Sequence, residues 1–279
     1  MASSGSSGPL RAGRLAMLHR LLGSEEPSPV FEYGRNGRSA FVIAVDHAGR
    51  RIPRKLGSLG LPAGELERHI AWDIGALDVA LRVASALDAP LVAQNYSRLV
   101  IDCNRDLRQP SSIPEVGESI EIPGNIGLDP QQVIARREEI FQPYHEHLRA
   151  LLDERERAGR RSILVAQHSM TDVFKGVRRQ MHAAVLYNRE RRFAGLVLEK
   201  LREESDFMIG DNEPYSGSDA VDYTIPFHAE LRGIPYVELE IRQDLILNQE
   251  GQSAWARRIA SALSKAEQAF LSVDPQTQP

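Results

Sequence analysis

Hydrophobic positions along the chain form two patterns, short apolar runs and longer amphipathic stretches that alternate with them. The apolar runs, several of them apolar on both faces, predict buried strands at residues 40–45, 91–93, 163–166, 183–186, 207–209 and 236–241. An apolar spacing of about 3.6 residues predicts helices over residues 71–87, 130–158, 191–204, 219–232 and 254–271. This alternation predicts an α/β fold, a single domain with a mainly parallel central sheet flanked by helices.

The segments outside this pattern set the expected limits of the domain. Residues 1–15, which begin with a stretch rich in Ser and Gly, and the polar residues 273–279 are expected to be disordered, which leaves residues 16–272 for the folded domain. Residues 106–129 mix prolines, glycines and acidic groups without a clear period, so we expect a long loop that covers a site.

Composition and charge exclude several classes of function. The 279 residues carry a formal net charge of -4, which leaves no excess of basic groups to neutralise the phosphates of a nucleic acid. No apolar run is long enough to cross a bilayer, and the first residues lack the pattern of a secretory signal. The only cysteine, Cys103, cannot form an internal disulfide and is a poor candidate for a nucleophile. We therefore expect a cytoplasmic protein that binds neither nucleic acid nor membranes.

Two histidines follow buried strands at the edge of the sheet where α/β proteins bind ligands. His47 comes directly after the first strand, and His168 comes after the third. Two imidazoles from separate strand ends could supply two of the ligands of a zinc site, which in a hydrolase usually has three protein ligands. Asp73, near the start of the first long helix, is the candidate for the third ligand. The alternatives are that Asp73 is a helix cap or a partner of the helix dipole, and that His47 and His168 are ordinary hydrogen-bonded histidines.

The last predicted strand alternates between apolar and charged residues. Glu238, Glu240 and Arg242 point to one side of it. Hydrolysis of an amide at a metal needs a carboxylate that takes a proton from water and delivers it to the leaving amine, and Glu240 is our candidate. Arg242 is placed beside it as a second candidate catalytic residue. The alternative is a surface strand with a simple ion pair between Glu240 and Arg242.

Several polar residues are candidates for binding a substrate. Either Arg98 or Arg105 could grip a carboxylate with two hydrogen bonds. The other candidates are Asn104, Ser169, Tyr215 and His228. Turn geometry is an alternative explanation for residues 210–217, which contain Tyr215, and packing is the alternative for His228.

Two further histidines and the absence of several common motifs limit the kinds of site that the chain can form. His145 and His147 lie two residues apart on a predicted helix, so they face different sides, and we expect both at the surface. The chain has no phosphate-binding P-loop, and neither Gly-x-Gly-x-x-Gly nor Gly-x-Ser-x-Gly follows a predicted strand. This excludes the commonest nucleotide-binding and serine-hydrolase motifs.

The motifs carrying these residues resemble those of the N-formylglutamate amidohydrolase family. The resemblance covers roughly residues 42–269 and rests on ordered blocks at residues 46–49 with 52–53, 71–76, 97–105, 167–169, 210–215 and 240–244. It implies a zinc-peptidase-like (phosphorylase/hydrolase-like) α/β fold and hydrolysis of N-formyl-L-glutamate to formate and L-glutamate. It also implies that His47, Asp73 and His168 hold zinc and that Glu240 is the general base.

From the residues and this resemblance together we expect a zinc enzyme, with another divalent metal as an alternative. Its expected partner is a small N-acyl amino acid with a carboxylate, and its expected state is a monomer or homodimer. Two other functions stay open: an amidase acting on a larger peptide or cell-wall fragment, and a binding protein without catalysis on the same scaffold.

Overall fold

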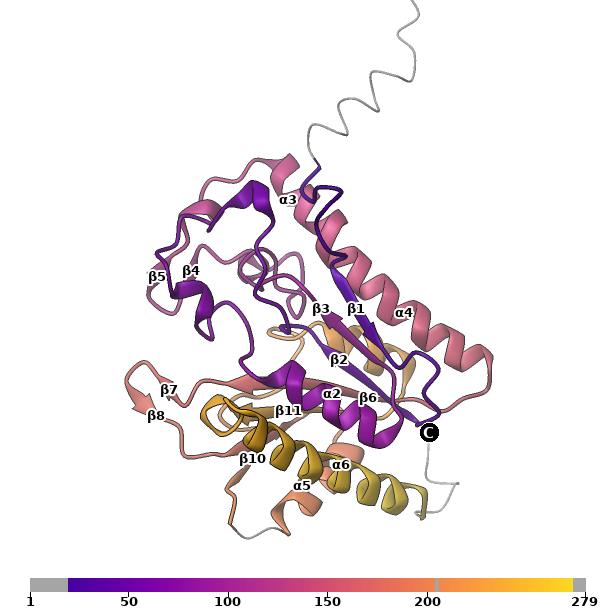
Figure 1. Cartoon of the computed structure of the whole chain (residues 1–279). Coiled ribbons are helices and arrows are strands. Elements are labelled where there is room, and N and C mark those ends of the chain that lie inside the picture. Colours follow the sequence, from indigo (N-terminus) through magenta and orange to yellow (C-terminus); the bar gives the residue numbers. More distant parts are fainter. Residues whose placement is uncertain (1–19, 204–205, 273–279) are drawn as a thin grey trace, which may run out of the picture.

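The computed structural model describes residues 20–203 and 206–272. They form one α/β domain around a sheet whose strands lie in the order β1, β3, β2, β6, β11, β9, β10 (Figure 1). The strands are β1 (Val30–Tyr33), β2 (Phe41–Val45), β3 (Leu91–Gln94), β6 (Ile163–Met170), β9 (Ala183–Leu186), β10 (Ile209–Asp211) and β11 (Tyr236–Arg242). The expected tails at 1–15 and 273–279 lie outside the described residues.

The direction of the strands confirms a mainly parallel sheet. Strands β3, β2, β6 and β11 run parallel to one another. The strands at both sides of the sheet run in the opposite direction. On one side β1 is antiparallel to β3. On the other side β9 is antiparallel to β11 and pairs in parallel with β10. The carboxyl ends of β2, β6 and β11 therefore lie at one edge of the sheet, where polar residues that follow the strands are brought together.

Helices cover the two faces of the sheet. The helices are α2 (Ala76–Leu87), α3 (Pro130–Arg136), α4 (Gln142–Arg157), α5 (Arg192–Arg202) and α6 (Gln249–Ser272). One face packs against α2, α5 and α6, and α4 lies against the other (Figure 1). None of the helices in the described part of the chain is both long and apolar enough to span a bilayer.

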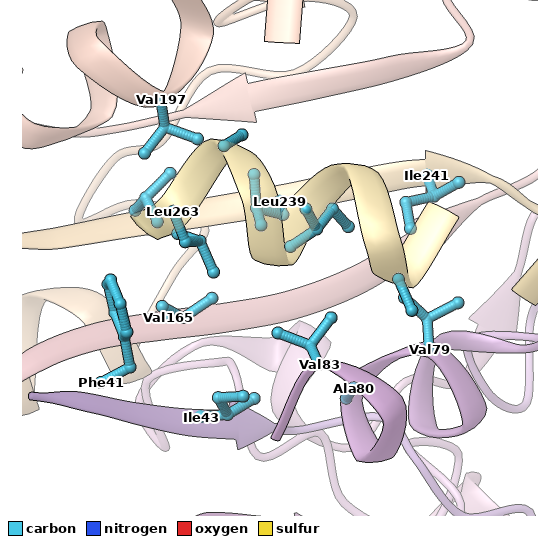
Figure 2. Packing of buried hydrophobic residues seen from close by; sticks show 14 of the residues in the cluster. Phe41, Ile43, Val79, Ala80, Val83, Val165, Val197, Leu239, Ile241 and Leu263 are labelled. Carbon is cyan, nitrogen blue, oxygen red and sulfur yellow. The ribbon is translucent and has the colours of Figure 1, made fainter. Parts of the chain in front are cut away.

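The core between the sheet and α2, α5 and α6 is apolar throughout. Figure 2 shows side chains of these helices, among them Val83, Val197 and Leu263, packed against Val165 and Leu239 of the sheet. Each of these side chains is almost completely buried. Alternation along β11 then turns Glu238 and Glu240 to the opposite face of the sheet.

Several predicted elements differ from the observed ones. The prediction of a helix over residues 219–232 is wrong, because only a π-turn at Ile225–Ala229 and a 3-10 turn at Glu230–Arg232 form there. The first long helix begins at Ala76 rather than at residue 71, since Gly75 takes a positive φ of 77° and ends the preceding turn. The long helix over 130–158 contains a π-turn at Arg137–Phe141, and strand β1 was not predicted.

Short hairpins complete the fold above the carboxyl edge of the sheet. Strands β4 (Val116–Gly117) and β5 (Ile120–Glu121) form one hairpin within the segment predicted as a long loop. Strands β7 (Val173–Phe174) and β8 (Val177–Arg178) form another, directly after β6. Both hairpins contribute side chains to the cavity described next.

Candidate active site and metal centre

A cavity of about 450 Å³ opens at the carboxyl ends of β2, β6 and β11. It lies where an open α/β sheet is expected to bind its ligand, and its size is in the range of small-molecule sites. The cavity brings together most of the residues singled out in the sequence, namely His47, Asp73, Arg98, Asn104, Arg105, His168, Ser169, Tyr215 and Glu240. Arg242 and His228 are not among its lining residues.

Three of these residues form a compact set of metal-ligand atoms. Asp73 Oδ2 lies 2.9 Å from His168 Nδ1 and 3.5 Å from His47 Nδ1. Ligand atoms from the three residues all lie within 4.8 Å of one another, and the side chains are buried. Two imidazole nitrogens and one carboxylate oxygen are a common protein ligand set for catalytic zinc, so the donor chemistry fits such an ion.

A buried aspartate lies at the far nitrogen of each histidine ring. His47 Nε2 is 2.7 Å from Asp102 Oδ1, and His168 Nε2 is 3.4 Å from Asp46 Oδ2. A carboxylate in this position holds the Nε2 proton and leaves Nδ1 free to bind a metal. Both rings therefore direct Nδ1 toward Asp73. Neither Asp46 nor Asp102 is predicted as a site residue from the sequence, although each lies in a block that carries the family resemblance.

The electrostatics of this cluster favour charged groups despite burial. Burial alone would raise the pKa of Asp46, but the contact with His168, the charges of His168 and His47 and the hydrogen bond from Thr224 together outweigh burial and hold that pKa at about 2. The pKa of Asp102 is held well below its usual value, mainly by the charge of Arg98 acting against burial. In the same way burial would lower the pKa of His168, yet its contact with Asp46, its hydrogen bond to Asp73 and the charges of Glu238 and Asp73 together keep it well above the usual value.

Asp73 is positioned by the turn that leads into α2. Its backbone N–H donates to the carbonyl of His47, 2.9 Å away, which ties the two ligand segments together. Gly75 is required here, because a Cβ at this position would lie 2.5 Å from the carbonyl oxygen of Ile246. The capping residue of α2 is Gly75, and no side chain caps it, so the alternative of Asp73 as a helix cap is wrong.

Glu240 lies beside the ligand set. It pairs in register with His168 on the neighbouring strand, so both side chains point to the same face. Burial raises the pKa of Glu240 to about 7, although the charge of His168 opposes the rise. A carboxyl group that titrates near neutral pH is suited to accept and return a proton. Burial also raises the pKa of Glu238, well above its usual value.

Arg242 does not pair with Glu240, so the alternative of a simple ion pair between them is wrong. Its guanidinium donates to Asp244 at 2.7 Å and to the backbone carbonyl of Arg179 at 3.0 Å. Arg242 is buried and fixes the segment that follows β8, which gives it a positioning role. The sequence pattern places it on the same side as Glu240 but does not reveal where its long side chain ends.

The arginines that line the cavity are held in different ways. Arg98 donates two bonds to Asp102 Oδ2, at 2.7 and 3.0 Å, and its Nη1 lies 3.2 Å from His47 Nδ1. Its charge therefore faces the ligand set rather than a distant part of the cavity. Arg105 Nη1 donates to the carbonyl oxygens of Asn104 and Val221.

The other predicted binding residues have structural partners. The side-chain oxygen of Asn104 accepts hydrogen bonds from the backbone N–H groups of Tyr223 and Thr224, and these bonds hold the turn that contains the two residues in place. The Ser169 hydroxyl donates to the carbonyl of Ile74, at 2.8 Å, and the Tyr215 hydroxyl accepts from Arg179. All three nevertheless line the cavity.

His228 lies within the core rather than in the cavity. Its Nε2 is 2.9 Å from His145 Nδ1, and the two rings stack with their centroids 5.2 Å apart. His145 is buried, so its predicted surface position is wrong, whereas His147 is half-buried beside Glu32. Burial raises the pKa of the Cys103 thiol well above its usual value, in line with the poor nucleophile expected from the sequence.

Comparisons with known proteins point to a single family. A family model for N-formylglutamate amidohydrolase matches residues 39–247. Gene product Atu2144 from Agrobacterium tumefaciens has a crystal structure with a TM-score of 0.88 and 35% identity, covering 91% of this chain and 100% of that chain. N-formylglutamate amidohydrolase from Ralstonia eutropha JMP134 has a TM-score of 0.64 and 18% identity, covering 88% and 100%. A comparison with curated proteins gives no match.

Proposed function

Because this chain belongs to the N-formylglutamate amidohydrolase family, we propose that it is a zinc-dependent enzyme that hydrolyses the amide bond of an N-formyl or N-acyl amino acid. N-formyl-L-glutamate is the first candidate substrate, and formate and L-glutamate are its products. The proposed setting is the cytoplasm, and the proposed state is a monomer or homodimer.

The observation that carries the proposal is the arrangement of His47, Asp73 and His168 next to Glu240. The three ligand atoms converge in a buried position, and Glu240 shares their face of the sheet. A bound divalent cation would supply Lewis acidity there, polarising the amide carbonyl and acidifying water. Another divalent metal is the alternative to zinc.

Glu240 is the proposed general base. Its carboxylate takes a proton from the attacking water, whose oxygen adds to the carbonyl carbon. The same carboxyl group then delivers the proton to the amide nitrogen, and the bond between carbon and nitrogen breaks. Its Oε2 atom is buried and has no hydrogen-bond partner among the described residues, which leaves it available for this water.

Arg98 is the proposed stabiliser of the negative charge that develops on the carbonyl oxygen. Asp102 holds two of its nitrogens, so the third, Nη1, is fixed beside His47 and Asp73. A donor fixed before the reaction does not have to reorganise in the transition state. Arg105, on another wall of the same cavity, is the proposed partner of the substrate α-carboxylate.

The variant Glu240→Gln tests this function. We expect it to bind zinc as the wild type does and to release glutamate from N-formyl-L-glutamate about 100-fold to 10,000-fold more slowly. The measurements are elemental analysis of the purified protein and a colorimetric assay of amine release. Glu121→Gln, an exposed change on β5, is the matched control and should keep full activity.

The same assay separates the remaining functions. Full activity in Glu240→Gln would contradict the assignment of the base. A wild type that binds zinc but hydrolyses no N-formyl or N-acyl amino acid would instead favour a binding protein or an amidase for larger peptide or cell-wall substrates.

A further inference from the structure

Arg179 follows strand β8, and its side chain packs against two aromatic rings of the cavity wall, although Arg179 is not itself among the residues that line the cavity. Its guanidinium carbon is 5.1 Å from the centroid of the Phe174 ring and 4.6 Å from that of the Tyr215 ring. Both rings line the cavity. Two rings packed against a planar cation restrict the orientations of its plane.

The charge of Arg179 is not compensated in the way that the neighbouring arginines are. Arg68, Arg98, Arg178 and Arg242 each form an ion pair with a carboxylate. Arg179 donates instead to the carbonyl oxygen of Thr171, at 3.1 Å, and to the Tyr215 hydroxyl. Within residues 20–203 and 206–272, no carboxylate forms an ion pair with it.

The backbone of Arg179 is also held in place. Its N–H donates to the carbonyl of Asp172, at 2.8 Å, across the base of the β7 and β8 hairpin. Its own carbonyl accepts from the buried guanidinium of Arg242. A cation fixed at both backbone and side chain loses little conformational entropy when it binds an anion.

We propose that Arg179 binds an anionic group of the substrate, the side-chain carboxylate of an acidic N-acyl amino acid, and thereby determines the preference among amino acids. This inference rests on the proposed function. The planar guanidinium can give a carboxylate two parallel hydrogen bonds, which a lysine cannot reproduce. The two rings that pack against Arg179 line the same cavity as Glu240.

The first test compares two substrates that differ only in this carboxylate, N-formyl-L-glutamate and N-formyl-L-glutamine. In Arg179→Gln we expect kcat/KM for the glutamate substrate to fall about 10-fold to 100-fold, mostly through KM, because a charge-assisted contact is lost. The value for the glutamine substrate should change less than about threefold. Arg178→Gln is the control, since Arg178 is exposed and paired with Asp244.

The second test measures binding without turnover. Calorimetric titration of the zinc-loaded proteins with glutarate, a dicarboxylate, should show affinity at least about tenfold weaker in Arg179→Gln than in the wild type. Arg179→Lys, which keeps the charge, should fall between the two. Equal losses for both substrates, or unchanged glutarate affinity, would overturn the inference. If the wild type hydrolyses neither substrate, the proposed reaction fails, while the glutarate titration still decides the role of Arg179.

Discussion

Asp46 shows how a single buried side chain controls a metal ligand at the residue scale. Its Oδ1 accepts from the hydroxyls of Tyr144 and Thr224, at 2.8 and 2.7 Å. Its Oδ2 faces His168 Nε2. This arrangement favours the His168 tautomer that carries its proton on Nε2, so that the lone pair on Nδ1 points toward Asp73 and His47.

The variant Asp46→Asn should reverse that preference. The amide oxygen would keep the two hydroxyl bonds, so the amide NH₂ group would face His168 Nε2 and favour a proton on Nδ1 instead. We expect zinc affinity to fall about 10-fold to 100-fold, measured by competition with a chromogenic chelator. Asp106→Asn, in a residue whose carboxylate pairs with Arg108 outside the cavity, is the control. Unchanged zinc affinity in Asp46→Asn would contradict the assigned tautomer.

The sequence predicted that His47, Asp73, His168 and Glu240 line the cavity. Polar residues at the carboxyl ends of buried strands, or at the start of a neighbouring helix, lie where an open α/β sheet forms its ligand-binding crevice. It did not predict the roles of Asp46 and Asp102. Those roles depend on which ring nitrogen each aspartate meets, and that is decided by the packing of distant segments. The same holds for His228, whose partner His145 comes from another element.

At the scale of elements, the turn before α2 and the register of β6 with β11 place the site. The structure extends β6 to Met170, beyond the predicted end at residue 166, so that His168 and Glu240 become cross-strand neighbours. Apolar periodicity misses this extension because the last residues of the strand are polar. Polar residues also explain why the prediction of a helix over residues 219–232 is wrong. Asp222 accepts from the backbone N–H of Ser218, and such local bonds compete with a helix.

The variant Gly75→Ala tests the importance of this turn. A Cβ at residue 75 would meet the Ile246 carbonyl and would also strain the positive φ. We expect a loss of about 1–3 kcal/mol in the free energy of unfolding, together with weaker zinc binding because Asp73 shifts. Gly233→Ala is the control, since Gly233 has a φ of 66° but open space around its Cβ position. Equal effects in urea unfolding and zinc binding for both variants would show that the contact with Ile246 has no special role.

For the whole molecule, both faces of the sheet carry a buried apolar core, and one of them also carries the candidate site. One face packs against three helices, α2, α5 and α6 (Figure 2), and the other packs against α4. The face packed against α4 also buries charged groups, which are paired with one another near the carboxyl ends of the strands. The sequence predicted the α/β class from the alternation of elements. It could not predict the reversed direction of β9 and β10, since a buried strand is apolar on both faces whichever way it runs.

Metal removal should therefore affect the stability of the entire domain. Zinc binding to the folded state alone would raise the free energy of unfolding by about 2.7 kcal/mol when free zinc is 100-fold above its Kd. The effect should be larger at pH 8 than at pH 6. His47 and His168 both have raised pKa values, and each must lose its Nδ1 proton to bind a metal, so zinc affinity increases as the pH rises. Urea unfolding with zinc and with a chelator measures this, and identical curves at both pH values would contradict it.

Zinc titration into chelator-treated wild type and His168→Ala, followed by calorimetry, tests the proposed metal centre most directly. The account predicts one ion per wild-type chain, with protons released on binding, and a loss of that site in His168→Ala. One ion bound with the same affinity in both proteins would show that the metal is held elsewhere.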